Sequence, residues 1–203
     1  LNSLFISSTV TIVALFFHSM AAYPLARLKF RGKKYVSLWI LSTLLIPFPV
    51  ITIPLFILVR SFNWLDTYQG VIVPAIPHAY GIFLFRQFFM SIPGELEEAA
   101  TIDGCSTFII YSRIFIPLSK PIAITLAVGF FIANWNNYLW PLIVNKDKQL
   151  WVLQVAIANF VSRGDTRWDA VLSSGVITVL PTILLFFLLQ KYLVAGIKMT
   201  GIK

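Results

Sequence analysis

The apolar stretch LFISSTVTIVALFFHSMAAYPL, residues 4–25, decides the fold class of this 203-residue chain. It carries no charge and is long enough to cross a bilayer core, which takes about 20 apolar residues in a helix. Four comparable runs, bounded by charges or turn residues, follow at 36–59, 71–89, 122–142 and 171–194. The sequence therefore predicts an all-α membrane protein, a polytopic helical bundle with five transmembrane spans.

The composition excludes the soluble classes of protein. Hydrophobic residues make up 58% of the chain and charged residues 12%, a balance far from that of a soluble domain. The net charge of +8 is spread over short stretches between the apolar runs, so we expect no nucleic-acid partner. With only Cys105 and two distant histidines, His18 and His78, we expect no disulfide, metal or haem.

The distribution of positive charge predicts the orientation of the spans. Residues 27–34 hold the densest basic cluster, which the positive-inside rule assigns to the cytoplasm. By parity, 61–70 and 145–169 are external, whereas 90–120 and the C-terminal tail are cytoplasmic. Because residue 1 would then be external, we expect one further span to precede it.

Several prolines fall within the apolar runs, where they remove internal hydrogen bonds and predict bends. The bends have two interpretations, kinks that help packing or a moving gate. The prolines concerned are Pro47, Pro49, Pro54, Pro74, Pro77 and Pro181.

The cytoplasmic segment 90–120 contains SIPGELEEAATIDG, residues 91–104, which predicts a short helix. Pro93 suits a first helical position, the glutamates of the first turn favour the helix dipole, and Gly104 suits a left-handed helix end. A second apolar turn, 108–116, then leads back to the bilayer. The segment 90–120 is called the elbow below.

The elbow is predicted to dock another protein. Two adjacent small residues, Ala99 and Ala100, would let a partner surface approach closely. The alternative is an amphipathic helix resting on lipid headgroups. Such helices normally have a basic polar face, whereas this one is acidic and would be repelled by anionic lipid.

The elbow resembles the conserved loop of the inner-membrane permeases of binding-protein-dependent ABC importers. That loop runs Glu-Ala-Ala, three residues, Gly, nine residues, Ile, one residue, Leu-Pro. This chain has Glu98-Ala99-Ala100, Gly104, Ile114 and Pro117 at those spacings, with Ile116 replacing Leu. Further residue groups are similar to the carbohydrate-uptake, maltose-type subgroup: Ile92-Pro93, Glu95-Leu96, Ile102-Asp103, Phe85-Arg86-Gln87-Phe88, Trp135-Asn136 and Trp140-Pro141.

The resemblance implies that the elbow is a coupling helix seated in a groove of an ATP-binding subunit. The residues that it implies for coupling are Glu98, Ala99, Ala100, Asp103, Gly104, Ile114 and Pro117. The chain has no phosphate-binding loop of the Walker type, so it is not an enzyme and the partner ATPase binds ATP and Mg²⁺. Further implied partners are a second, related permease subunit, an external solute-binding protein and a sugar-like solute, at a bacterial-type inner membrane.

The fourth run offers a candidate solute path in its outer half. Phe130, Asn134 and Asn137 share one face at helical spacing, and Tyr138 lies beside them. Amides could bind sugar hydroxyls while aromatic rings cover sugar carbons. Alternatively, Tyr138 belongs to an interfacial aromatic belt together with Trp135 and Trp140.

Other interpretations stay open. An ion-coupled secondary transporter would need acidic residues within its spans, and these runs contain none. A scaffold subunit of another membrane complex is compatible with the composition, but neither alternative explains the elbow. The external segment 145–169, with Arg163, Asp165 and Arg167, is either a short surface helix that meets the binding protein or a solvated loop.

Overall fold

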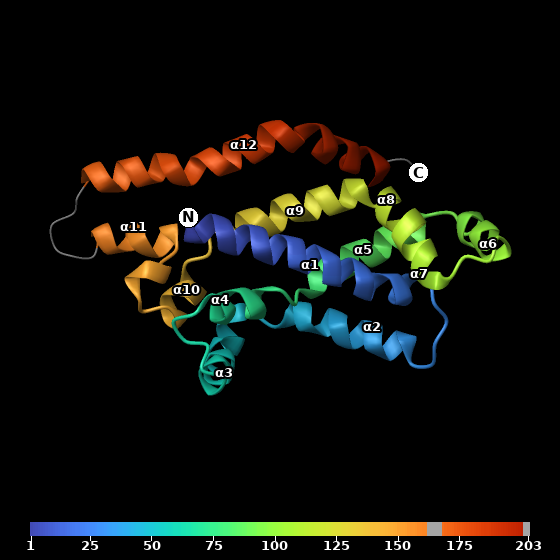
Figure 1. Ribbon diagram of the computed structural model, residues 1–203, viewed down its shortest axis with the longest axis horizontal. Helices are drawn as coiled ribbons and strands as arrows, with labels where there is room; N and C mark the ends of the chain where they lie inside the picture. Colours follow the sequence, from blue (N-terminus) through green and yellow to red (C-terminus); the bar gives the residue numbers. More distant parts are fainter. Residues whose placement is uncertain (162–167, 201–203) are drawn as a thin grey trace. The chain divides into compact units, whose positions relative to one another are not determined.

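The regular structure of the chain is helical. The computed structural model describes residues 1–161 and 168–200, and no strand occurs within those ranges (Figure 1). The helices are α1 (Asn2–Ala26), α2 (Lys33–Ser42), η1 (Thr43–Leu45), α3 (Phe48–Ser61), α4 (Tyr68–Ala75), α5 (Ala79–Ser91), α6 (Glu95–Ile102), α7 (Thr107–Ile110), the π-helical turn η2 (Tyr111–Phe115), α8 (Ile116–Leu118), α9 (Lys120–Trp135), α10 (Leu139–Val144), η3 (Lys148–Leu150), α11 (Leu153–Val161) and α12 (Trp168–Thr200).

Helices cover all five apolar runs, but only the first and last runs are unbroken. By length and composition, α1 and residues Trp168–Leu185 of α12 could each cross a membrane alone. Three bent helix pairs bring the number of candidate spans in the described chain to five if each pair counts as one. One of these pairs joins Thr107–Leu118 to α9, so the span boundaries drawn from the sequence stay a prediction.

The prolines act differently from one position to the next. At Pro47 the helix is interrupted, because the preceding Ile46 takes the extended conformation that proline imposes on its neighbour. Pro77 lies in the break between α4 and α5. By contrast, Pro54 and Pro181 remain inside α3 and α12. Proline content alone therefore does not locate the breaks.

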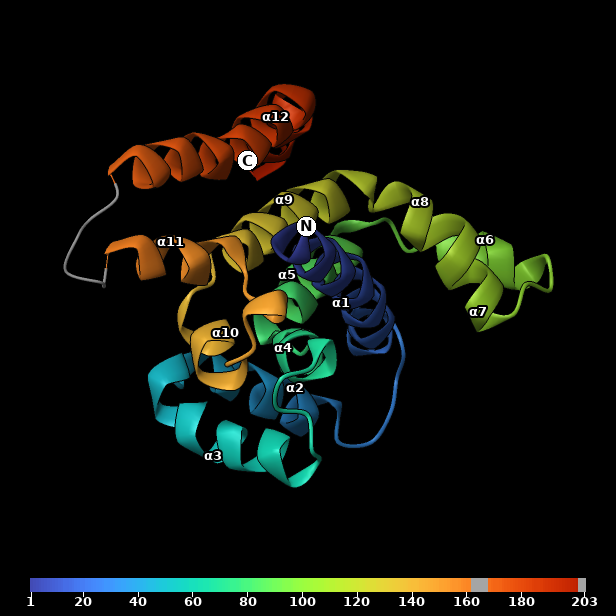
Figure 2. The ribbon, with the colours of Figure 1, turned by 60° about the vertical axis from the view of Figure 1, so that its left-hand side comes forward.

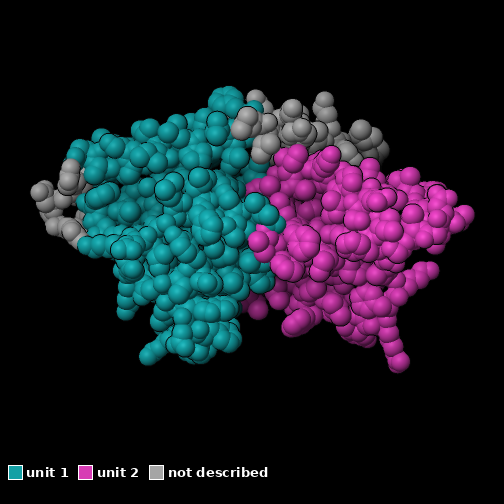
Figure 3. All heavy atoms as spheres, viewed as in Figure 1, with its two compact units in different colours: residues 1–12, 47–77, 128–191 teal, residues 13–46, 78–127, 192–203 magenta. Residues whose placement is uncertain are grey.

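The chain divides into two compact units, shown in different colours in Figure 3. Unit 1 comprises residues 1–12, 47–77 and 128–191, and unit 2 comprises residues 13–46, 78–127 and 192–203. The core of unit 1 consists of Ile6, Val10, Val59, Val71, Ile72, Trp140, Val144, Val152 and Val155. Within it, the Trp140 indole donates to the Gly70 carbonyl at 3.0 Å. A β-carbon at Gly70 would overlap the Trp64 carbonyl oxygen, so this close packing requires glycine.

Unit 2 has an aromatic core, formed by the buried rings of Tyr23, Phe85, Phe89, Tyr111 and Phe115. The Tyr23 and Phe115 rings meet edge to face with their centroids 5.0 Å apart, and Phe89 packs on Phe115 at 5.5 Å. Such edge contacts are the favoured geometry for aromatic pairs. The cluster ties α1 and α5 to the π-helical turn η2.

Most of the described part of the predicted external segment 145–169, residues 145–161 and 168–169, is helical. It contains η3 and α11, and the α11 residue Val155 lies in the core of unit 1. Asp66 bonds to its first residues by accepting from the Lys146 and Asp147 backbone N–H groups. A surface helix is thus present, although Arg163, Asp165 and Arg167 lie outside the described residues.

Candidate functional site

The first helix of the elbow, α6, has well-defined ends. It begins at Glu95, two residues later than the sequence predicts, so that Pro93 precedes the helix. At its other end Gly104 has φ +77°, the left-handed conformation expected there. The Cys105 N–H donates to Ala100 O at 2.9 Å and the Gly104 N–H to Thr101 O at 3.0 Å. This pair of bonds is a Schellman motif, which turns the chain sharply into α7.

The second half of the elbow is a continuous helical stretch made of α7, η2 and α8. The Ser106 side chain caps its start by accepting from the Ile109 N–H. In both ribbon views α6 and α7 lie side by side (Figures 1 and 2). The elbow is therefore a helical hairpin.

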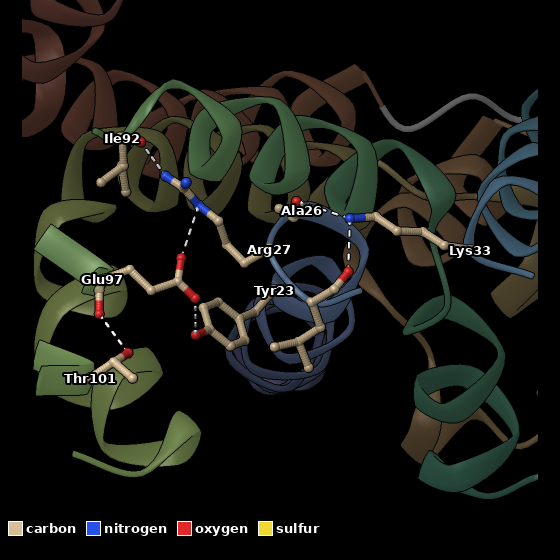
Figure 4. Close-up of polar contacts among 8 residues, drawn as sticks. Tyr23, Ala26, Arg27, Lys33, Ile92, Glu97 and Thr101 are labelled. Atoms are coloured by element: carbon tan, nitrogen blue, oxygen red, sulfur yellow. Dashed lines mark hydrogen bonds and ion pairs between the residues drawn. The ribbon is translucent and has the colours of Figure 1, made fainter. Parts of the chain in front are cut away.

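Arg27, at the end of α1, anchors the elbow. Its guanidinium donates to the Ile92 carbonyl and forms an ion pair with Glu97 of α6, with Nε and Oε2 3.8 Å apart. The same guanidinium lies over the Phe115 ring, 5.0 Å from its centroid. Figure 4 shows the Arg27 guanidinium with dashed lines to the Ile92 carbonyl and to the Glu97 carboxylate. One side chain, directly after the last residue of α1, thus contacts both halves of the elbow.

Two more residues on the same face of α1 strengthen this anchor. The Tyr23 hydroxyl donates to Glu97 Oε1 at 3.3 Å, and Ser19 Oγ hydrogen-bonds to the Tyr111 hydroxyl at 2.9 Å. Burial raises the pKa of Tyr111, so this hydroxyl remains neutral at physiological pH. Ser19, Tyr23 and Arg27 follow one another at four-residue spacing, which places them on one helical face.

The elbow exposes large apolar side chains. Ile102, at the end of α6, is 86% exposed, and Phe108, at the start of α7, is 71% exposed. Leu96 and Ile109 are also exposed. Large exposed apolar side chains that form one contiguous patch are typical of a protein-binding site.

The structure distributes the predicted coupling residues over several environments. Glu98, Ala99, Asp103, Gly104 and Pro117 are exposed, whereas Ile114 is half-buried. Ala100 is only 8% exposed and packs inside unit 2. The prediction that Ala99 and Ala100 together form a small-residue docking surface is therefore wrong for Ala100, because the two adjacent side chains point to different faces of α6.

Sequence reasoning missed the anchor. From the sequence, Arg27 is only one of several basic residues that set the topology, and Glu97 is only one of the first-turn glutamates that favour the helix dipole. The signal that could have found them is the four-residue spacing of Ser19, Tyr23 and Arg27, which places polar groups on one face near the end of an apolar helix.

The candidate solute path differs from its prediction. Helix α9 ends at Trp135, so Asn137 lies beyond the helix and does not share a helical face with Phe130 and Asn134. The Asn134 amide donates to the Phe130 carbonyl of its own helix at 2.8 Å, and Phe130 is buried. Tyr138 is exposed.

The aromatic-belt alternative is also wrong for two of its three rings. Trp135 is 6% exposed and donates to the Thr178 carbonyl at 2.9 Å, and Trp140 is 2% exposed and donates to Gly70. Both indoles are thus packed within unit 1. Of the three rings, Tyr138 alone is exposed, as a ring at the interface of membrane and water would be.

The family model described as "binding-protein-dependent transport system inner membrane component" matches residues 14–199, and the chain belongs to this family. It is therefore an inner-membrane transport subunit.

Individual relatives agree with this assignment. The chain is 36% identical over 202 residues, 100% of its length and 72% of the relative's, to the arabinooligosaccharides transport system permease protein AraQ of Halalkalibacterium halodurans. It is 34% identical over 199 residues, 97% of its length and 71% of the relative's, to the sn-glycerol-3-phosphate transport system permease protein UgpE of Pectobacterium atrosepticum. A chain in the crystal structure of a bacterial ABC transporter involved in alginate import matches with a TM-score of 0.84 and 26% identity, covering 94% of this chain and 72% of that one.

Proposed function

We propose that this chain is the permease subunit of an ATP-driven importer for a sugar or a sugar-derived solute. With a second, related permease subunit it forms the path for a solute that an external binding protein delivers. Support comes from relatives named for the transport of arabinooligosaccharides and of sn-glycerol 3-phosphate. The chain contains no phosphate-binding loop, so ATP and Mg²⁺ bind to separate ATPase subunits.

The proposed membrane arrangement follows the charge pattern. The spans are 4–25, 36–59, 71–89, 122–142 and 171–194, with the elbow and the C-terminus in the cytoplasm. The basic cluster 27–34 supports this orientation, because positive loops remain on the cytoplasmic side.

The exposed apolar surface of the elbow carries the proposal that it couples the permease to the ATPase. Ile102 and Phe108 would face water in the cytoplasm unless another protein covered them. The acidic Glu98 of the same elbow can contact basic groups in the groove of the ATPase that receives the elbow. The Arg27 anchor connects this surface to α1, so that a displacement of the elbow reaches the membrane part of unit 2.

The test replaces one apolar residue of the docking surface by an acid. Ile102→Asp should weaken ATPase binding by about tenfold or more, since burying such a side chain contributes roughly 1.5–3 kcal/mol. The matched control is Phe30→Asp, an exposed apolar residue of the same predicted cytoplasmic side but outside the elbow. The measurement is the amount of ATPase that co-purifies with the tagged permease. Equal ATPase retention in Ile102→Asp and the control would contradict the docking role.

We propose further that Asn134, Asn137, Phe130 and Tyr138 contribute to the solute path. The half-buried asparagines adjoin the break between α9 and α10, where an interrupted helix leaves backbone groups for ligands. Uptake of arabinooligosaccharides and of sn-glycerol 3-phosphate by the assembled transporter identifies the solute class. Transport of neither compound, nor of any other sugar, would contradict the carbohydrate assignment.

A further inference from the structure

A basic hollow lies between the start of α2 and α5, both in unit 2. It has a volume of about 460 Å³ and is lined by Lys33, Lys34, Ser37, Leu38, Leu41 and Arg86. The coupling and solute-path assignments use none of these residues. Three of the six are cationic, and no acidic residue is among them.

The start of α2 adds to the positive charge of the hollow. The residue before the helix is Gly32, which offers no side-chain acceptor for the first N–H groups, and the first turn contains no acidic residue. The N–H groups at a helix start attract anions, although here the first of them, the Lys33 N–H, already donates to Phe30 O at 3.4 Å. Helix α2 has ten residues, enough for a full helical dipole contribution.

Two of the cations are fixed in position by the end of α1. The Lys33 ammonium donates to the carbonyls of Ala26 and Leu28 at 3.1 and 3.0 Å, and Figure 4 shows this side chain. The Arg86 guanidinium donates through Nε to Leu25 O at 3.1 Å. Both side chains retain further N–H donors, because an ammonium has three and a guanidinium five. They are thus ordered before any ligand arrives.

The charges in the hollow are not balanced by carboxylates. Burial, and then the nearby charge of Arg86, lower the pKa of Lys33, which lies outside the predicted span 36–59. Within the described part of the chain one ion pair is found, between Arg27 and Glu97. It involves neither Lys33 nor Arg86. The buried hydroxyl oxygen of Ser37 likewise has no hydrogen-bond partner there. An anion in the hollow would satisfy all of these groups.

The remaining walls are apolar and continue along an uncovered helix. Leu38 and Leu41 line the hollow, and no residue of α2 is completely buried within the chain. Tyr35 and Trp39, one turn apart on α2, are both strongly exposed, and such rings favour the membrane interface. A cationic pocket that opens onto apolar residues complements a molecule with an anionic head and hydrocarbon chains.

We propose that this hollow binds an anionic phospholipid, with its phosphate among Lys33, Lys34, Arg86 and the Ser37 hydroxyl and its acyl chains along Leu38 and Leu41. The proposal goes beyond the transport function and does not depend on the coupling role of the elbow.

Lys34 gives the cleanest test, because it lines the hollow but donates no hydrogen bond within the described residues. The complete transporter, reconstituted with phosphatidylglycerol and phosphatidylcholine, is analysed by native mass spectrometry. Retained phosphatidylglycerol should exceed phosphatidylcholine, and Lys34→Glu should lower its retention by about tenfold. Lys29→Glu is the matched control, since it makes the same charge change on an exposed residue of the same basic cluster. Equal loss in both variants, or no preference for the anionic lipid, would overturn the proposal.

Two further arms distinguish other occupants of the hollow. Excess inorganic phosphate should not displace the retained lipid, and displacement would identify the site as one for free phosphate. Leu38→benzoylphenylalanine places a photoreactive group at the apolar wall of the assembled transporter. Illumination should attach a phospholipid to the permease, whereas a cross-link to another protein chain would show that a subunit covers the hollow and would overturn the lipid proposal.

Discussion

Gly104 combines a constrained backbone with open surroundings. Its φ is +77°, yet a β-carbon built there would meet nothing within 4 Å. Gly104→Val therefore introduces backbone strain of roughly 1–2 kcal/mol or more without a steric clash. We expect the spans to insert normally, the ATPase to bind less tightly and hydrolysis to become uncoupled from uptake. ATPase retention and substrate-driven uptake in vesicles measure these effects.

A matched glycine at the other end of α6 controls for bulk. Gly94 also has open space around a β-carbon, but its φ of −67° suits any residue, so Gly94→Val should be mild. Gly104→Asn should recover part of the coupling, because asparagine tolerates the left-handed region. Normal uptake and full ATPase retention in Gly104→Val would exclude the coupling-helix assignment.

The two half-buried asparagines near the break after α9 test the solute path. Loss of one amide contact to a hydroxyl removes about 0.5–1.5 kcal/mol, so Asn134→Ala or Asn137→Ala should reduce uptake several-fold without releasing the ATPase. Asn136→Ala is the control, because both ends of that amide have partners, the nitrogen Ile132 O and the oxygen Gln154, whereas within the described residues the Asn134 amide bonds through its nitrogen alone. Unchanged uptake in the first two variants would favour a packing role.

At the scale of elements, the link between α1 and α6 depends on Arg27. Arg27→Gln removes the ion pair with Glu97 and weakens the contacts with Ile92 and Phe115. Because the pair is largely screened from solvent, we expect a local destabilisation of about 1–3 kcal/mol. Hydrogen exchange in α6 should accelerate, and substrate-stimulated ATP hydrolysis should yield less uptake.

A double-mutant cycle isolates the ion pair from the packing contacts. Arg27→Gln and Glu97→Gln should together cost less than the sum of their separate effects, since either change alone already breaks the pair. Arg31→Gln, on an exposed residue of the same basic cluster, should leave exchange in α6 unchanged. Strict additivity of the two variants would show that the pair does not connect the elements.

At the scale of the whole molecule, Cys105 reports the orientation of the chain. It is the single cysteine in the sequence and is partly exposed, directly after Gly104. A membrane-impermeant thiol reagent should fail to label it in intact cells and should label it in inside-out vesicles once the ATPase is removed. As a control, Asp147→Cys in a Cys105→Ser background should be labelled from outside. Labelling of Cys105 in intact cells would contradict the predicted topology and favour the opposite orientation.

The sequence predicted the long helices and the end of the elbow helix, because each depends on local information. Continuous apolar composition defines α1 and α12, and a glycine with positive φ ends α6. The break at Asn136–Tyr138 was missed because the polar run of residues 134–138 was interpreted as a solute-binding face within one continuous span, although several asparagines in succession also favour a turn. The Arg27–Glu97 pair was missed because its partners are 70 positions apart in sequence, and charge counting assigned Arg27 to the basic cluster.

The exposed side chains of Ile102 and Phe108 have a consequence for how cells make this subunit. A copy synthesised without its ATPase would present these side chains to the cytosol, where chaperones and membrane proteases bind exposed apolar segments. Surplus copies would then be degraded, so that the level of this subunit follows that of its partner. Balanced expression of the two genes would thus be a requirement of protein quality control as well as of transport.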